Sequence, residues 1–208
     1  MAAPDRVAWR HWLLIGLLAC CGIGRAEGPA GATFGFGSGV FEGLMLAVDA
    51  GGAITGYFQE DQGEGVTKRC SFFLAGQAGA GRTPVVTWRT EVFPGSLQAE
   101  PGAVRLQIEK GREHPGCAAV LLPQIASGLS LDRVAEARWT ALRRIVAARS
   151  HFYSEPPRAK ELRAFVVKGD VVGVLVESGD WLQVEYRGPK ATVTGWIPAK
   201  DAAKLAPP

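Results

Sequence analysis

The stretch Val104-Arg105-Leu106-Gln107-Ile108-Glu109 alternates apolar and polar side chains without a break. Successive side chains of a β-strand point to opposite faces of the sheet, so this period of two predicts a strand with one buried face and one solvated face. Antiparallel sheets accept such strands, whereas parallel strands are covered on both faces and form continuous apolar runs. The stretch therefore favours an all-β fold with antiparallel strands.

Shorter runs with the same period flank this stretch. Two of them surround the pair Gly51-Gly52, which predicts a tight hairpin because glycine accepts the positive φ of such turns. In the next run, Cys70, Phe72 and Leu74 are expected to share one face. This spacing predicts an antiparallel β sandwich or small barrel. The predicted strands are residues 44–48, 53–58, 70–74, 83–90, 104–109 and 117–122.

The first 26 residues have the three parts of a secretory signal peptide. Arg6 and Arg10 precede an apolar core of about ten residues, too short for the ~20 that cross a bilayer, and the small residue Ala26 ends the segment. We therefore predict export to the periplasm or cell envelope. Cleavage after Ala26 would release a soluble protein. Alternatively, the stretch from Leu17 to Cys20 resembles a lipoprotein cleavage box, with Cys20 as the lipid anchor.

Export bears on the cysteines that remain, Cys70 and Cys117. Two thiols in an oxidising compartment are most simply one disulfide. A metal site would need nearby histidine ligands, and a reactive thiol would leave the second cysteine without a role. We predict a disulfide that ties the third strand to the last strand of this region.

The charge of the chain argues against a nucleic-acid partner. The formal net charge is +3, from 23 basic and 20 acidic residues. Removal of residues 1–26 takes away three basic residues and one acidic residue, which leaves a net charge of +1. A nucleic-acid-binding protein needs a large surplus of basic residues to neutralise phosphates, and a net charge of +1 does not provide it.

Residues 131–148 carry a second periodicity. Apolar side chains from Leu131 through Trp139 to Ile145 fit a helical stripe. The pattern that follows is incompatible with a helix through Ala148. We therefore expect only a short helix or irregular turn over about 131–139.

Four short motifs follow in order within a region of about 65 residues that begins at Leu142, where an opening strand is expected. They are Ser154-Glu155-Pro156, Lys168-Gly169-Asp170, Gly179-Asp180-Trp181 and Gly195-Trp196-Ile197. The set resembles a bacterial SH3-like domain, a small five-stranded barrel common in exported proteins. The resemblance implies such a barrel over residues 141–208, with Arg143–Tyr153 as its first strand. Residues 27–140 then form a separate β-rich domain that carries no family motif.

Alternation within this region predicts which side chains fill the barrel. Leu182, Val184 and Tyr186 alternate with Trp181 and its polar successors, and the aliphatic set is expected inside. The segment 187–191 before the last strand is longer than in the shortest members of the family.

Catalytic motifs are missing from the sequence. It contains no nucleophile elbow, no zinc-protease helix motif and no phosphate loop. His114 is expected in a surface turn and His151 in a strand, while Glu60, Asp61 and Glu64 read as a solvated hairpin tip. We therefore predict a protein that is not an enzyme and that uses no cofactor or metal.

The resemblance implies instead a groove that binds peptides against aromatic walls. The ligand-binding candidates are Tyr153, Trp181, Tyr186 and Trp196, with Trp181 expected to be the most exposed. For Tyr186 and Trp196 a place in the core is an equal alternative. The loop wall would be formed by Glu155, Pro156 and Pro157, and the aromatic residues of the N-terminal domain, namely Phe34, Phe36, Tyr57, Phe58, Phe72, Phe73 and Trp88, are expected mostly in its core.

These observations predict an exported, non-enzymatic envelope protein that binds cell-wall peptide or an envelope protein through its SH3-like domain. The first alternative is an inhibitor or immunity-type protein that neutralises a wall-degrading enzyme or toxin through the N-terminal domain. A structural accessory protein is the second, and an envelope hydrolase that uses His114 or His151 is the third.

Overall fold

The computed structural model describes residues 35–63, 68–156 and 160–208. The protein is all-β, with 57% of residues in strands and 7% in helices, which confirms the predicted fold class. Helical residues form single 3₁₀ turns such as η2 (Gly111–Glu113), η3 (Pro123–Ala126) and η4 (Ala199–Asp201). No helix among the described residues is long and apolar enough to cross a membrane. The predicted signal peptide, Cys20, Phe34, Glu64 and Pro157 lie outside the described residues.

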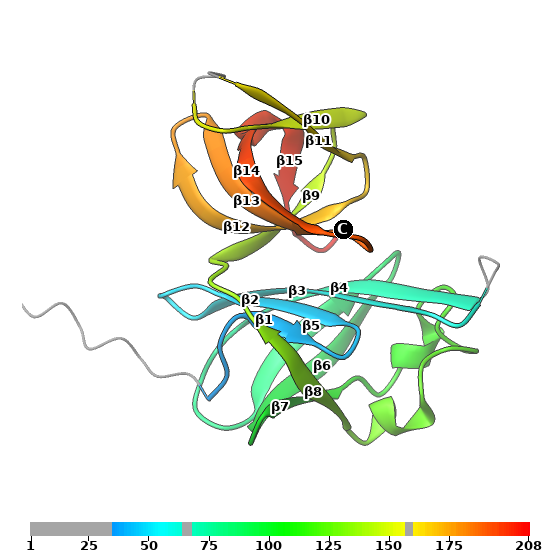
Figure 1. Cartoon of the computed structure of the whole chain (residues 1–208). Helices are drawn as coiled ribbons and strands as arrows, with labels where there is room; N and C mark the ends of the chain where they lie inside the picture. Colours follow the sequence, from blue (N-terminus) through cyan, green and yellow to red (C-terminus); the bar gives the residue numbers. More distant parts are fainter. Residues whose placement is uncertain (1–34, 64–67, 157–159) are drawn as a thin grey trace, which may run out of the picture. The chain divides into compact units, whose positions relative to one another are not determined.

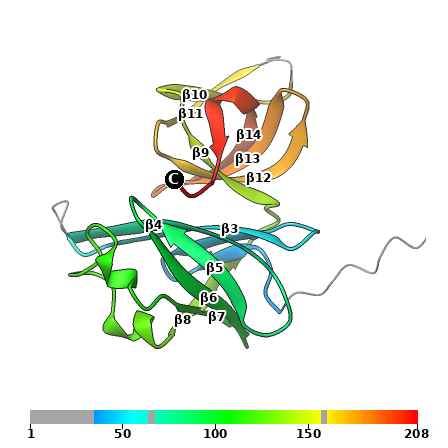
Figure 2. The ribbon, with the colours of Figure 1, turned by 180° about the vertical axis from the view of Figure 1, so that it is seen from behind.

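The first eight strands form a closed antiparallel barrel in which each strand pairs with the next and β8 pairs with β1 (Figures 1 and 2). Of the two predicted architectures, the small barrel is therefore correct. The strands are β1 (Gly39–Phe41), β2 (Leu44–Val48), β3 (Ala53–Asp61), β4 (Arg69–Gln77), β5 (Thr83–Trp88), β6 (Val92–Glu100), β7 (Ala103–Gln107) and β8 (Leu129–Glu136).

Alternating side chains fill this barrel as the sequence predicts. Val104, Leu106 and Ile108 are fully buried, while the polar residues between them reach the surface. Gly52 takes a positive φ of 83° in the predicted β2–β3 hairpin. Among the aromatic residues expected in the core, five are buried and Tyr57 is half-buried; the five are Phe36, Phe58, Phe72, Phe73 and Trp88.

Residues 131–139 do not form the expected helix or turn. Residues up to Glu136 belong to β8, which pairs with β7 on one side and β1 on the other and so closes the barrel. Leu131 is buried, whereas Val134, a member of the proposed helical stripe, is 67% exposed. Barrel closure therefore outweighs the local helical spacing, because it satisfies the backbone hydrogen bonds of both neighbouring strands.

The prediction of a strand at 117–122 is also wrong. This segment consists of turns between η2 and η3, with Cys117 accepting a hydrogen bond from the Leu121 amide. Its side chains Val120 and Leu121 are nevertheless buried in the barrel core. The apolar run thus forms turns that pack into the barrel. Its composition is the same as that of a buried strand, so composition alone does not separate the two.

The predicted disulfide between Cys70 and Cys117 is present, with an S–S distance of 1.99 Å. It joins β4 to the turns after η2, not to a last strand, because that strand does not exist. Both cysteines are fully buried in the barrel core. The bond therefore fastens the long β7–β8 connection, which carries few ladder hydrogen bonds, to the sheet.

We expect the double substitution Cys70→Ala/Cys117→Ala to lower the free energy of unfolding by about 4 kcal/mol. The bond joins cysteines 47 residues apart, and without it the unfolded chain has a higher conformational entropy and is therefore more stable. Denaturant unfolding of the variant and of the oxidised parent measures this difference. Equal midpoints would show that the bond does not stabilise the barrel.

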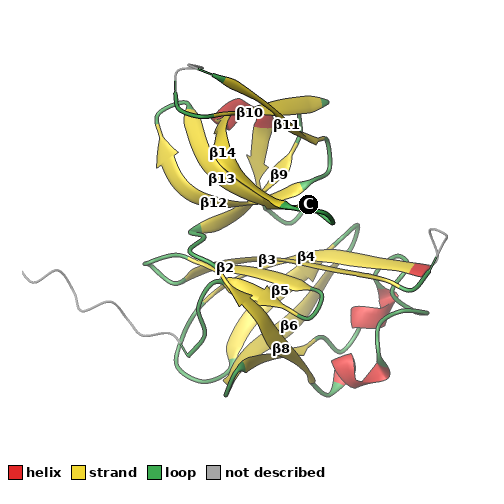
Figure 3. Ribbon diagram, in the orientation of Figure 1, coloured by secondary structure: helices red, strands yellow, loops and turns green. Residues whose placement is uncertain are grey.

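The second sheet has seven strands in the order β11-β10-β14-β13-β12-β9-β15 (Figure 3). Five strands were expected. The predicted first strand, Arg143–Tyr153, is divided in two because the amides of Ile145 and Val146 donate to the carbonyls of Asp170 and Asp201, which turns the chain. The strands are β9 (Ala141–Ile145), β10 (Arg149–Tyr153), β11 (Glu161–Val167), β12 (Val171–Ser178), β13 (Trp181–Arg187), β14 (Thr192–Pro198) and β15 (Ala202–Lys204).

Aliphatic side chains fill the curled second sheet. Leu182 and Val184 are buried, as alternation predicts, and they pack with Phe152 and Ile197 from the neighbouring strands. The polar partners of this alternation, such as Gln183, remain partly exposed. The inner face is thus committed to packing, and the opposite face of β13 and β14 is left for other contacts.

Trp139 lies directly before β9 and is 1% exposed. Its indole ring covers Gly173 of β12 so closely that a Cβ atom there would overlap Cδ1, Cδ2 and Cε2 of the ring. The ring belongs to a cluster that also contains Leu142 and Val171 of the second sheet and Phe73 and Trp88 of the barrel. Residues Gly31–Pro208 accordingly form one compact unit.

We expect Gly173→Ala to lower the free energy of unfolding by about 1–3 kcal/mol, because the methyl group has no space beneath the indole ring. Gly79→Ala is the matched control, since a Cβ at Gly79 meets no atom within 4 Å, and it should change stability by less than about 0.5 kcal/mol. Thermal and denaturant unfolding compare the two. Equal effects would mean that the Trp139–Gly173 contact yields at little cost.

Candidate functional site

Three of the four predicted ligand-binding residues lie on the outer face of the second sheet. Tyr153 in β10 is directly opposite Trp196 in β14, and Trp196 is opposite Gln183 in β13. The rings of Tyr153 and Trp181 meet edge to face, with centroids 5.4 Å apart. All three aromatic side chains are partly exposed. Their position follows from the strand period, because the inward positions on these strands hold Phe152, Leu182 and Ile197.

Two further rings extend this surface. His151 and Phe165 form a cross-strand pair between β10 and β11, with ring centroids 5.7 Å apart. Phe165 is 43% exposed, and the Arg149 guanidinium lies 4.2 Å from its ring centre. We call the set Tyr153, Trp181, Trp196, His151 and Phe165 the aromatic face.

One carboxylate sits within the aromatic face. Oε2 of Glu161 accepts a hydrogen bond from the Tyr153 hydroxyl at 3.2 Å, and its Oε1 lies 3.2 Å from Nδ1 of His151. Glu161 is therefore hydrogen-bonded to one ring of the face and lies next to a second, although Nδ1 of His151 has no hydrogen-bond partner among the described residues. With Arg149 nearby, the face carries charges of both signs beside exposed aromatic surface.

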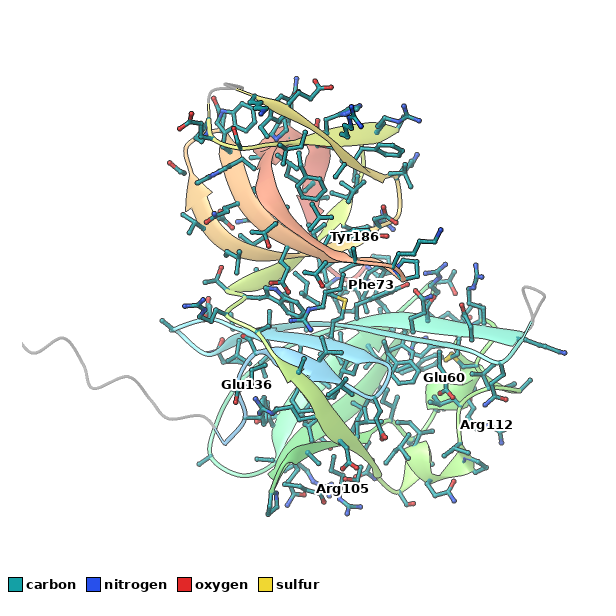
Figure 4. All side chains as sticks on the ribbon, viewed as in Figure 1. Glu60, Phe73, Arg105, Arg112, Glu136 and Tyr186 are labelled. Atoms are coloured by element: carbon teal, nitrogen blue, oxygen red, sulfur yellow. A yellow bond between two sulfur atoms is a disulfide. The ribbon has the colours of Figure 1, made fainter. Side chains whose placement is uncertain are left out.

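Tyr186, the fourth predicted residue, is not part of this surface. It shares the side of β13 that carries Leu182 and Val184 and packs partly buried against that core (Figure 4). Burial is the main cause that raises the pKa of its phenol, and the carboxylate of Asp170, which is hydrogen-bonded to it, raises the pKa further. The structure thus separates Tyr186 from the other three.

A hollow of about 370 Å³ adjoins the aromatic face. Trp181 and Pro198 line its apolar part, and Asp180 and Lys200 supply one negative and one positive charge. The amide of Ser154 donates to the carbonyl of Lys160, which closes the base of the loop that contains Glu155 and Pro156. A ligand lying along the face would therefore find both an aromatic platform and a pocket at its end.

His114 was expected in a surface turn, but its side chain is 1% exposed in the core of the barrel. The ring stacks on Phe72, at 4.8 Å between centroids, and meets Phe93 edge-on. The buried Cys117, Val120 and Leu121 that follow hold this turn against the core, so its polar composition is misleading. His114 is a packing residue of the barrel and not an accessible acid or base.

The hydrogen bonds of His114 determine its tautomer. The Thr87 hydroxyl donates to the carbonyl of Phe93 at 3.2 Å, so its oxygen accepts from Nε2–H of His114 at 3.0 Å. Nδ1 is then unprotonated, and it has no hydrogen-bond partner among the described residues. A proton there would be a buried charge without compensation, and burial lowers the pKa of His114 from 6.5 to about 4.

Other candidates for chemistry are surface groups. Glu60 and Asp61 lie near the end of β3, where the carboxylate of Asp61 forms an exposed ion pair with Arg69 at 3.0 Å. Within the described ranges, no three His, Cys, Asp or Glu side chains are arranged to hold a metal ion. Among the described residues of the aromatic face, His151 lies next to one carboxylate, that of Glu161.

No sequence pattern singled out Phe165, Arg149 or Glu161 as parts of this surface. The short apolar run from Ala164 to Val167 does not show by composition that Leu162, Ala164 and Val166 face inward while Phe165 faces outward. The usable signal in the sequence would have been the two-residue period of β11, which places Leu162, Ala164 and Val166 on one side. It is weak because Phe165 and Val167 are apolar and yet exposed.

No family model matches the chain, and no curated protein or solved structure matches it.

We expect the stability of the protein to fall as pH decreases from 6.5 to 4. The unfolded chain protonates His114 in this range and the folded chain does not, so the loss reaches about 3 kcal/mol near pH 4 and no further loss from this group occurs below it. Denaturant unfolding across this range measures the slope. His114→Gln should remove most of it, and His151→Gln should retain it; an unchanged slope in His114→Gln would assign the effect to other groups.

Proposed function

We propose that residues 141–208 form a bacterial SH3-like domain and that the aromatic face is its binding site for an extended peptide. In this proposal the protein is exported, has no enzymatic activity and acts in the cell envelope. Its ligand is cell-wall peptide or a segment of an envelope protein. Residues 1–26 would direct export, followed by release after Ala26 or lipidation of Cys20.

The observation that carries the proposal is the gathering of partly exposed aromatic rings on one sheet face. Tyr153, Trp181 and Trp196 come from three strands: Tyr153 is the cross-strand partner of Trp196, and its ring meets the ring of Trp181. Aromatic side chains provide large, stiff contact area with little loss of conformational entropy, and they dominate the energetics of binding sites. Extended peptides bind such platforms in several recognition modules.

The charges near the rings favour a peptide over a neutral apolar ligand. Glu161 can accept from an amine or amide, and Arg149 can donate to a carboxylate or carbonyl. The hollow beside Trp181 adds Asp180 and Lys200. A peptide that carries both free amino and carboxylate groups complements this mixture, and a ligand with charge of a single sign does not.

A pull-down with purified peptidoglycan tests the proposal on the chain from residue 27 to 208. We expect the parent protein to sediment with the wall material and Trp181→Ala to lose at least tenfold in affinity, because a central aromatic anchor is typically worth 2 kcal/mol or more. Thermal unfolding must show that the variant remains folded.

Two control variants sharpen the result. Tyr186→Phe changes the predicted residue that lies on the other side of β13 and should bind like the parent. Val134→Ala alters an exposed apolar side chain of the barrel and should also bind normally. Absence of sedimentation in the parent would refute wall binding and favour a protein partner met by the barrel. A loss of stability in Trp181→Ala without a change in binding would indicate an accessory structural role.

A further inference from the structure

A second hollow lies apart from the aromatic face and has a different character. It has a volume of about 240 Å³, and its lining includes Phe73, Trp88, Arg89, Arg144 and Lys204. The segment after β15 supplies the remaining wall. We call it the basic hollow.

Three elements bring the cations of the basic hollow together. Arg89 directly follows β5, Arg144 lies within β9 and Lys204 ends β15, which is paired with β9 so that Ala203 faces Arg144. All three side chains are exposed. None forms an ion pair within 4.0 Å with an acid in the described part of the chain.

The arginines that do have acidic partners lie elsewhere in the structure. Arg69, Arg105, Arg143 and Arg187 each lie within 3.0 Å of a carboxylate oxygen. The whole chain carries a formal charge of only +3. Three cations around one hollow, none with an ion-pair partner within 4.0 Å in the described part of the chain, therefore concentrate positive potential at a single place, and such a potential attracts anions.

The floor of the basic hollow is aromatic and rigid. Phe73 (labelled in Figure 4) and Trp88 are 5% and 4% exposed, with ring centroids 6.0 Å apart. Both belong to the packed cluster around Trp139. The Arg144 guanidinium lies 5.9 Å from the Phe73 ring centre, which fixes one cation over the floor. The site is thus formed before any ligand arrives.

We propose that the basic hollow binds an organic phosphate monoester. The dianionic phosphate would be held by Arg89, Arg144 and Lys204, because guanidinium forks and ammonium groups form strong charge-assisted hydrogen bonds to phosphate oxygens. The apolar body of the ester would lie against the small part of Phe73 and Trp88 that lines the hollow. The volume is below the roughly 300 Å³ at which drug-sized sites begin, so the ligand is about the size of one ring with its phosphate.

Calorimetric titration of the chain from residue 27 to 208 tests this proposal with phenyl phosphate, inorganic phosphate and phenol as probes. We expect phenyl phosphate to bind at least tenfold more tightly than either of the other two, and its Kd to increase with salt. Arg144→Gln and Lys204→Gln should each weaken it at least tenfold. Arg82→Gln, an exposed arginine without an ion pair among the described residues, should have no effect.

Several results would overturn the proposal. Equal affinity for inorganic and phenyl phosphate would reduce the site to general anion attraction, and an equal loss in Arg82→Gln would reduce it to net charge. If Arg144→Gln fails to fold, Arg89→Gln in the exposed turn after β5 replaces it, and undiminished binding by Arg89→Gln and Lys204→Gln would refute the site.

Co-sedimentation with phosphatidic acid vesicles distinguishes a lipid headgroup from a soluble ester, since both present the same phosphate monoester. Peptidoglycan retention is a separate readout and does not depend on these variants.

Discussion

The packing of Trp139 on Gly173 is the constraint on which both sheets depend. The indole has Gly173 against it and the Arg187 guanidinium 5.1 Å from its ring centre, and its backbone carbonyl accepts a 2.6 Å hydrogen bond from Ser38 of the barrel. Leu142, three residues later, donates its amide to the Thr55 hydroxyl. The chain therefore passes from β8 to β9 through a fixed point, where a large ring fits only because residue 173 has no side chain.

In the second sheet, packing determines which side chains face inward and which face outward. The inner positions of β10, β13 and β14 hold Phe152, Leu182 and Ile197, so their neighbours in sequence must face out. A domain this small has room for only a few large rings inside. The outward aromatic residues are consequently left at the surface, where the cross-strand pairing of Tyr153 with Trp196 gathers them in one place.

The sequence was sufficient where a local pattern and the tertiary requirement agree. The alternation at 104–109, the Gly51-Gly52 hairpin and the Cys70–Cys117 bond are such cases. It was insufficient where closure of the barrel determines the structure. Residues 131–136 form a strand that closes the barrel, although their apolar spacing fits a helix. Strand β6 was not predicted, because Pro94-Gly95 interrupts its pattern. For His114, local composition gives no information on which neighbours arrive from distant strands, so its burial could not be derived. Tyr186 lies on the side that its alternation with Leu182 and Val184 predicts, which is the core position that the sequence left open.

The aromatic face and the basic hollow both rest on strands held by packed cores, and this is what makes them plausible as binding surfaces on physical grounds. Ordering a flexible loop around a ligand costs about 0.5–1.5 kcal/mol for each immobilised side chain, whereas a side chain already held by its neighbours costs less. Glu161 positions Tyr153, and the Trp139 cluster holds Phe73 and Trp88. The two surfaces differ in charge, since one carries both signs and the other carries three cations without an ion pair in the described part of the chain, so the ligands that we propose for them differ in chemistry.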